Sequence, residues 1–274
     1  AHGVNYFDTA YLYNNGESEK CIGAILRDYP RDSFFLADKM PGRLVGSVTD
    51  GDRMFKEQLV RCGVNHFDFY LCHAIGRTET DFTDPYQRTG FFDYLLERKK
   101  EGVIRRLGFS FHGTPPRLEF LLNQYDWDFV QLQLNYVDWE VQDARRLYEM
   151  LEQRGIPCIV MEPVRGGSLH TLCPEAISLL KQARPKRSVA SWAIRYAASL
   201  PNVLTVLSGM NSLEQVRDNV TAMTGFTPLD QEERAVLDKA RAAYLQTGAI
   251  PCTGCGYCMH CPMGVDIPKV FALY

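Results

Sequence analysis

The stretch FDFYLCHA, residues 67–74, decides the fold class of this chain. It is short and almost continuously apolar, whereas a strand with one face in water alternates apolar and polar residues. The stretch therefore predicts a strand that is buried on both faces, with the polar His73 interrupting the run near its end. Strands of this kind are typical of parallel sheets that helices cover.

The same pattern recurs along the chain. Short apolar runs predict six more strands, at residues 4–10, 34–40, 105–111, 129–136, 157–163 and 203–209. Between them lie stretches whose apolar residues recur at steps of three and four, as in amphipathic helices. Strand–helix alternation implies right-handed crossovers and a parallel sheet. The order predicts an α/β fold, a (β/α)8 TIM barrel with its first strand missing, and a doubly wound open sheet is the alternative.

The end of the barrel is predicted near residue 248. The segment 229–248 has the pattern of a closing helix, with Asp230 as its N-cap and Gly248 as its stop. A different, cysteine-rich segment follows. We therefore expect two parts, a barrel over residues 1–248 and a small cysteine segment over residues 249–274.

Composition excludes several classes of protein. The chain has 274 residues, 46% hydrophobic and 23% charged, which is enough for a large core. Its net charge of −3 is spread without a basic stripe, so no nucleic-acid partner is expected. No apolar run approaches the ~18 residues of a membrane span. An odd cysteine total of 9 without a signal-like start favours reduced thiols and a cytoplasmic location.

Four titratable side chains mark the predicted carboxyl ends of the strands, where a parallel barrel holds its active site. Asp8 ends the first predicted strand, Tyr13 follows on the next loop, Lys39 ends the second and His73 the third. A phenol has an ordinary pKa of about 10, which a nearby ammonium lowers. A carboxylate can hold that ammonium, and a histidine can orient a substrate oxygen. The set suits proton transfer to a carbonyl.

The stretches around these residues resemble the aldo-keto reductase superfamily. They are FDTAYLYNNGESEKCIG (7–23), LADKMP (36–41) and YLCHA (70–74). The resemblance implies a barrel and hydride transfer between a nicotinamide and a carbonyl or alcohol. It also implies that Tyr13 is the general acid, that Lys39 and Asp8 tune it, and that His73 orients the carbonyl.

The resemblance also suggests residues that hold the nicotinamide ring. Ser110 and Gln131 match the family pattern. Phe111 stands where the family has an Asn, and Met161 stands where it has a stacking Tyr. These two departures put the ring site in question.

Two glycine-containing segments are the candidates for binding the rest of the cofactor. Gly166 and Gly167 allow backbone to approach a pyrophosphate. LSGMNSLEQVRDN (207–219) resembles the family's adenosine-phosphate loop, where backbone amides and a helix start favour an anion. Its candidate residues are Ser208, Gly209, Met210, Gln215 and Asn219.

The identity of the cofactor stays open. No Lys or Arg directly follows Ser208 to bind a 2′-phosphate, so NADPH and NADH are both retained. Arg165 and Arg217 are alternative phosphate contacts. His112 is a further candidate for the rim of the pocket.

The segment CTGCGYCMHCPMGVDIP, residues 252–268, has the spacing of a ferredoxin-type run. Its candidate ligands for a 4Fe–4S cluster are Cys252, Cys255, Cys258 and Cys261, the last followed by Pro262. Structural zinc is the alternative, although zinc cysteines are generally two separated pairs. The usual run has three residues before its last cysteine and this one has two, so whether Cys261 binds the same cluster stays open.

Together these features resemble an aldo-keto reductase subgroup with a C-terminal 4Fe–4S segment. Its members start earlier and continue further, so we expect a chain trimmed at both ends. The prediction is a reductase of a small carbonyl or alcohol whose cluster serves electron transfer or sensing. Coupling one-electron and two-electron steps would require a flavin or a radical. The alternative is an electron-transfer or regulatory protein, with a partner protein, whose barrel has lost nicotinamide catalysis.

Overall fold

The computed structural model describes residues 3–248, 250, 252, 258–259 and 261–273. The chain divides into two compact units. The first contains Ala1–Gln133 and Asp143–Val160, and the second contains Leu134–Gln142 and Met161–Tyr274. This division differs in kind from the predicted boundary between a barrel (1–248) and a cysteine segment (249–274). That boundary stays a prediction.

The first unit is built on strands that neighbour one another in chain order. Parallel ladders join β1 to β2, β2 to β3, β3 to β4 and β4 to β5. The amide of Val130 donates to the carbonyl oxygen of Pro157 at 3.0 Å, which brings β6 alongside β5. The strands are β1 (Tyr6–Asp8), β2 (Phe35–Pro41), β3 (Phe67–Ile75), β4 (Ile104–Phe111), β5 (Phe129–Gln133) and β6 (Cys158–Met161).

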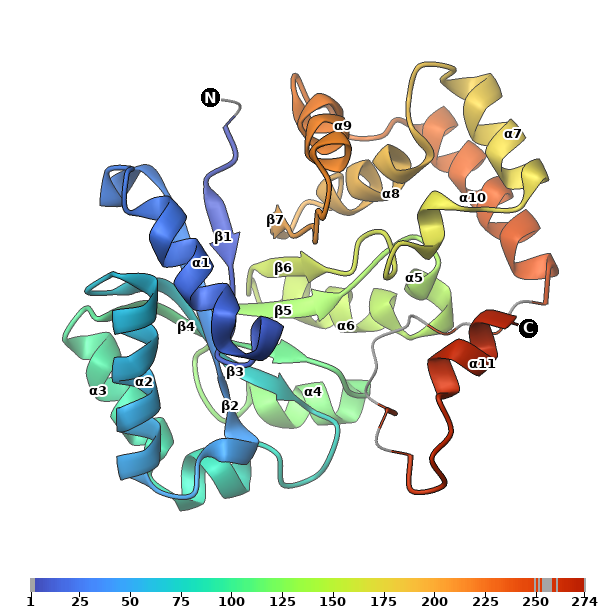
Figure 1. The fold of residues 1–274 in the computed structure, drawn as a ribbon. Helices are drawn as coiled ribbons and strands as arrows, with labels where there is room; N and C mark the ends of the chain where they lie inside the picture. The colour runs from blue at the N-terminus through green and yellow to red at the C-terminus, as the bar shows by residue number, and fades with distance from the viewer. Residues whose placement is uncertain (1–2, 249, 251, 253–257, 260, 274) are drawn as a thin grey trace. The chain divides into compact units, whose positions relative to one another are not determined.

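Helices follow these strands, as the alternating pattern predicts. They are α1 (Glu17–Leu26), α2 (Val48–Cys62), α3 (Phe91–Lys100), α4 (Pro115–Leu122) and α6 (Ala144–Gln153), and Figure 1 shows α1, α2 and α3 along one side of the strands. Short turns η1 (Tyr13–Gly16), η2 (Arg31–Ser33), η3 (Gly42–Leu44) and η4 (Thr83–Arg88) connect them. Gly23 lets α1 approach α2 closely, because a Cβ there would lie 2.4 Å from the carbonyl oxygen of Arg61.

Side chains from alternate strands meet inside this unit. The ring of Phe69 on β3 contacts Tyr6 on β1 at 5.0 Å and Phe129 on β5 at 5.1 Å, both edge to face. Layers of residues from alternate strands fill the interior of a (β/α)8 barrel. An open doubly wound sheet would not bring the inner faces of three alternate strands together. The unit is therefore the curled parallel sheet of a (β/α)8-like barrel, as predicted.

The described residues of the second unit are mostly helical and include the strand β7. Its elements are α5 (Asp138–Val141), η5 (Ser168–His170), α7 (Pro174–Ala183), α8 (Val189–Ala198), β7 (Val203–Val206), α9 (Leu213–Met223), α10 (Gln231–Gln246) and α11 (Ile267–Leu273). Here α7 packs on α10, and α8 packs on β7 and α9. Arg195 of α8 donates to the carbonyl oxygens of Ala222 and Thr227, which ties α8 to the end of α9. Among the described residues, no helix is long and apolar enough to cross a membrane.

Local polar contacts decide where elements begin and end. Asp230 caps α10 as predicted, and Glu233 completes a capping box. By contrast, β5 ends at Gln133 although the apolar pattern predicts a strand to residue 136. The side chain of Asn135 accepts the amides of Val137 and Asp138, and this turn ends the strand.

Candidate functional site

Lys39 lies at the centre of the candidate site and is fully buried. Its ammonium pairs with the Asp8 carboxylate and also donates to the carbonyl oxygen of Thr9 at 2.8 Å. Register explains the meeting, because Asp8 lies opposite Ala37 in the β1–β2 ladder and Lys39 is two residues further along β2. The two predicted residues are thus brought together at one end of the strands.

Tyr13 and His73 lie against the same lysine. The Lys39 ammonium lies 4.8 Å from the centroid of the Tyr13 ring, and the Tyr13 and His73 rings meet edge to face at 5.6 Å. Pro41 lies opposite His73 in the β2–β3 ladder, which places the histidine beside the lysine strand. All four residues predicted as catalytic therefore lie together in the first unit.

A left-handed turn sets the position of Tyr13. Asn14, Asn15 and Gly16 have φ values of 51°, 57° and 86°, so three consecutive residues lie in the left-handed region. Asn and Gly adopt this region with the least strain. The turn reverses the chain between β1 and α1 and leaves Tyr13 38% exposed, with its ring packed edge to face with His73.

The electrostatics of the site keep Lys39 charged and His73 neutral. Burial alone would lower the pKa of Lys39, but the nearby Asp8 and Tyr13 outweigh it and raise that pKa above its ordinary value. Burial raises the pKa of Asp8, and the attraction of Lys39 opposes this. Burial, followed by the charge of Lys39, lowers the pKa of His73 to about 3. The imidazole is therefore uncharged at neutral pH.

Two of the predicted nicotinamide residues are neighbours on adjacent strands. Ser110 of β4 lies opposite Gln131 of β5, and both side chains are buried. The hydroxyl of Ser110 accepts the amide of Ala74 at 2.7 Å. Ala74 has a φ of 56° and directly follows His73. Ser110 thus also holds the backbone that carries the histidine.

The predicted adenosine-phosphate residues lie in the second unit, before and within α9. The amide of Asn219 donates to the hydroxyl of Ser208 at 2.9 Å. The side chain of Gln215 accepts the backbone amide of Asn211 at 2.8 Å, so both residues fold the loop back onto the helix. Gly209 is exposed and Met210 is half-buried on this loop.

Gly166 and Gly167, the predicted pyrophosphate-binding glycines, lie on the loop that follows β6. Polar groups of this loop are bound by side chains of the chain itself. Glu162, Arg165, Gly166 and Gly167 all have positive φ, and the Glu162 carboxylate accepts the amide of Gly166 at 2.5 Å. The suggestion that Arg165 contacts a phosphate is wrong. Arg165 is buried and its guanidinium pairs with Asp138 at 2.8 Å, because a buried cation needs a counter-charge.

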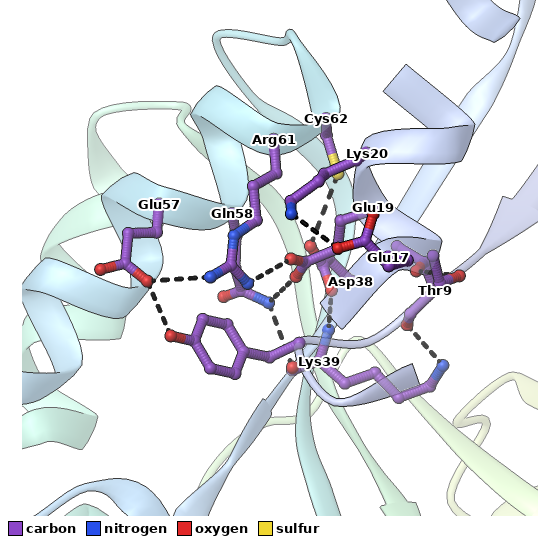
Figure 2. Close-up of polar contacts among 12 residues, drawn as sticks. Thr9, Glu17, Glu19, Lys20, Asp38, Lys39, Glu57, Gln58, Arg61 and Cys62 are labelled. Atoms are coloured by element: carbon purple, nitrogen blue, oxygen red, sulfur yellow. Dashed lines mark hydrogen bonds and ion pairs between the residues drawn. The ribbon is translucent and has the colours of Figure 1, made fainter. Parts of the chain in front are cut away.

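A buried polar cluster behind Lys39 was not predicted from the sequence. Figure 2 shows it between α1, α2 and strand β2. The carboxyl of Asp38 accepts the backbone amide of Lys39 at 2.8 Å, and the amide of Gln58 donates to the carbonyl oxygen of Lys39 at 3.1 Å. Both backbone polar groups of Lys39 are therefore held from the outer face of the strand.

Two fully buried acids, Glu19 and Asp38, belong to this cluster. Arg61 pairs with Glu19 at 2.9 Å, and Gln58 also donates to Glu19 at 3.1 Å. Burial, followed by the negative charge of Glu19, raises the pKa of Asp38 well above its ordinary value. The environment of Asp38 therefore favours its protonated form, which can share a hydrogen bond with Glu19. The sequence contains one indication of this cluster. Asp38 is adjacent to Lys39 in a predicted strand, so its acidic side chain must point to the opposite face of the sheet.

The described part of the cysteine segment contains three of the four predicted ligands. Cys252 and Cys261 are half-buried and Cys258 is exposed, while Cys255 lies outside the described residues. Hydrogen bonds from the backbone of Val265 and Met263 lower the pKa of Cys261. Within the described residues, no three His, Cys, Asp or Glu side chains are grouped so that they could hold a metal ion.

A curled parallel sheet whose strand ends join an acid, a tyrosine, a buried lysine and a neutral histidine defines a barrel oxidoreductase. The aldo/keto reductase family model matches residues 1–242. The chain belongs to this family and is an NAD(P)-dependent oxidoreductase.

Known proteins agree with this assignment. The chain is 26% identical over 257 residues to L-galactose dehydrogenase of Arabidopsis thaliana, covering 85% of this chain and 78% of that protein. It is 26% identical over 267 residues to the NADH-specific methylglyoxal reductase of Escherichia coli, covering 81% of this chain and 79% of that protein. An aldo-keto reductase of Bacillus halodurans in its holo form has a similar structure, with a TM-score of 0.72, 27% identity and coverage of 87% and 83%.

Replacing Asp38 tests its protonation. The raised pKa favours the uncharged acid, and Asp38→Asn replaces it with an uncharged group of the same shape, so we expect the free energy of unfolding to change by less than about 1 kcal/mol. Asp38→Ala leaves buried groups of Lys39, Cys62 and Glu19 without their partner, and we expect a loss of about 2–4 kcal/mol. Urea unfolding of both variants measures this. Asp126→Asn, at an exposed acid outside the cluster, is the control, and equal losses for Asn and Ala would contradict an uncharged Asp38.

The low pKa of His73 predicts an acid-dependent stability. The unfolded chain binds a proton near pH 6.5, whereas the folded chain does not until pH falls toward about 3. The stability that His73 contributes is therefore fully present above pH 6.5 and is lost as pH falls below it, by up to about 2 kcal/mol at pH 5. Unfolding of the chain and of His73→Gln from pH 7.5 to 5 measures this. Parallel pH profiles for the two proteins would show that His73 is not the cause.

Proposed function

We propose that this protein reduces small carbonyl compounds, with Tyr13 as the proton donor and with a 4Fe–4S cluster bound by its cysteine segment. The observation that supports the reductase most directly is the buried ammonium of Lys39. It is paired with Asp8 on one side and lies against the Tyr13 ring on the other. No structural need of the barrel requires a buried lysine beside an exposed tyrosine.

The reaction follows from the chemistry of these side chains. A bound nicotinamide supplies the hydride that the carbonyl carbon receives. The Tyr13 hydroxyl gives its proton to the carbonyl oxygen, so that the product is an alcohol. The adjacent Lys39 ammonium stabilises the phenolate that remains. Asp8 balances the charge of Lys39 and fixes its position, and solvent can return the proton because Tyr13 is 38% exposed.

His73 orients the substrate rather than donating a full proton. Its pKa of about 3 keeps the imidazole neutral across physiological pH. A neutral imidazole can still donate one hydrogen bond to the carbonyl oxygen. Its ring lies 5.6 Å from the Tyr13 ring, so both side chains can reach a common oxygen. In the reverse direction the same pair can hold an alcohol while Tyr13 accepts its proton.

The residues that would hold the nicotinamide cofactor are in two places. Ser110 and Gln131 are adjacent buried polar side chains beside the His73 strand, which suits the amide of a nicotinamide. In the second unit, the loop from Ser208 to Asn211 leads into α9, whose first turn offers backbone amides to an anion. No Lys or Arg directly follows Ser208, and the exposed Arg217 of α9 stays a candidate phosphate contact, so the proposal covers NADH and NADPH.

The proposed cluster rests on the spacing of Cys252, Cys255, Cys258 and Cys261. Four thiolates at steps of three residues, followed by a proline, suit a single loop around a 4Fe–4S cluster. The backbone of Met263 and Val265 donates to the sulfur of Cys261, and such hydrogen bonds to sulfur stabilise a thiolate ligand. When bound, the cluster would supply one-electron chemistry for electron transfer or sensing.

Removing the phenol of Tyr13 tests the reductase. Tyr13→Phe deletes the proton donor without changing the ring, so we expect kcat for carbonyl reduction to fall by about 10²–10⁴-fold. Steady-state oxidation of NADH and NADPH with methylglyoxal and with benzaldehydes measures this. Tyr11→Phe is the matched control, because the Tyr11 hydroxyl bonds to Glu57 at 2.7 Å, outside the site.

A Tyr13→Phe variant that retains full turnover would remove Tyr13 from the mechanism. If the unmodified chain oxidises neither nicotinamide with any carbonyl, the alternative of an electron-transfer or regulatory protein is favoured. Phe111, which is buried where the family has an Asn, is the observation behind that alternative.

Metal analysis tests the cluster separately. We expect anaerobically purified protein to contain about four iron and four sulfide per chain. Cys258→Ala should lose most of the iron, whereas Cys21→Ala, an exposed cysteine on α1, should keep it. Zinc in place of iron, or iron that is indifferent to Cys258, would contradict the proposal. Carbonyl reduction by the iron-free protein would show that the cluster is separate from hydride transfer.

A further inference from the structure

Two arginines lie near His73, on the loops that follow β2 and β3 in the first unit. Arg43 lies in η3, two residues after Pro41, which pairs with His73 in the sheet. Arg77 lies two residues after Ile75, the last residue of β3. Both arginine side chains are exposed, and both lie close enough to add to the lowering of the pKa of His73. Their loops leave the same end of the sheet at which His73 and Lys39 lie.

Backbone packing holds Arg77 next to His112. The amide of His112 donates to the carbonyl oxygen of Ile75 at 3.0 Å. A Cβ on Gly113 would lie 2.1 Å from the carbonyl oxygen of Gly76, so these two glycines bring the β3 and β4 loops into direct contact. Burial, followed by the charge of Arg77, lowers the pKa of His112 to about 4. Arg77 and His112 therefore lie on two loops that are in direct contact.

The acids of these loops already have other partners. Asp81 and Glu79 lie 3.6 and 3.9 Å from Arg117, and Asp81 also accepts the amide of Arg77. Asp84 pairs with Arg88 at 2.9 Å. Arg43, in contrast, has no ion-pair partner in the part of the chain that the structure describes. The rim around His73 thus holds more positive than negative charge.

We propose that the substrate carries an anionic group, a carboxylate or a phosphate, near its carbonyl, and that Arg43 and Arg77 bind that group. This inference rests on the proposed function, since it assigns the substrate class of the same site. A guanidinium binds carboxylate and phosphate oxygens through paired, charge-assisted hydrogen bonds. An anion held on the η3 and β3 loops would direct the adjacent carbonyl toward Tyr13 and His73. His112 can donate one further hydrogen bond.

The experiment compares substrates that differ in charge and little else. The carboxylate pair is 4-carboxybenzaldehyde and 4-formylbenzamide, and the phosphate pair is glyceraldehyde 3-phosphate and glyceraldehyde. We expect kcat/KM to be at least about tenfold higher for the charged member of one pair. Which pair shows the preference identifies the anion. The preference should shrink as salt is raised, because screening weakens attraction between exposed charges.

Substitution of the arginines locates the effect. Arg43→Gln and Arg77→Gln should each lower kcat/KM for the preferred anion by about tenfold, mainly through KM, and leave the neutral analogue within about twofold. Arg145→Gln is the control, because Arg145 pairs with Glu149 on α6. Since both test side chains are exposed, the variants should keep the far-ultraviolet circular dichroism and Tm of the parent.

The results of these experiments distinguish a failure of the anionic-substrate proposal from a failure of the proposed reductase function. If neutral carbonyls are reduced as well as their charged partners, or if the arginine variants lower turnover of both equally, the anionic substrate class is wrong and the reductase stands. If no carbonyl of either kind oxidises NADH or NADPH, the proposed function itself fails. A charge preference that survives in both arginine variants would assign the anion to other residues.

Discussion

The burial of one ammonium group constrains the rest of the site. A charged lysine excluded from water costs several kcal/mol unless its partners replace the lost solvation. Lys39 meets this requirement through Asp8 and the carbonyl oxygen of Thr9, both supplied by the adjacent strand and its extension. The register of β1 against β2 therefore cannot shift without exposing an unpaired charge. The catalytic ion pair and the parallel pairing of the first two strands stabilise each other.

The helix-covered face of β2 carries buried acidic groups, whereas the opposite face carries the buried ammonium of Lys39. Asp38 is next in the chain to Lys39, yet its side chain lies among α1 and α2, where Glu19 already supplies a negative charge that Arg61 balances. A second negative charge beside Glu19 is unfavourable, and this repulsion adds to burial in raising the pKa of Asp38. Gln58 links this outer cluster to Tyr70 and to the carbonyl oxygen of Lys39. Side chains of α1 and α2 thereby fix the backbone of Lys39, whose own side chain points to the opposite face of the sheet, where the candidate active site lies.

The sequence was sufficient for what depends on local pattern, and insufficient for what depends on contact between distant segments. Continuous apolar runs indicated the strands, and polar residues at their ends indicated Asp8, Tyr13, Lys39 and His73. Strand ends were less predictable, because the turn at Asn135 depends on a side chain that accepts backbone amides. Arg165 looked like an exposed phosphate ligand, since nothing in the sequence shows that Asp138, 27 residues earlier, pairs with it. The partnership of Glu19 with Asp38 was hidden for the same reason.

The turn that carries Tyr13 also limits how this part of the chain can vary. Three successive residues with positive φ exclude β-branched and most bulky side chains, since only glycine and asparagine or aspartate occupy that region at low cost. Few residue types are therefore tolerated from Asn14 to Gly16, although none of these side chains has a role in the proposed reaction. Substitutions that alter substrate preference are therefore better tolerated on the loops that follow β2, β3 and β4 than in this reversal of the chain.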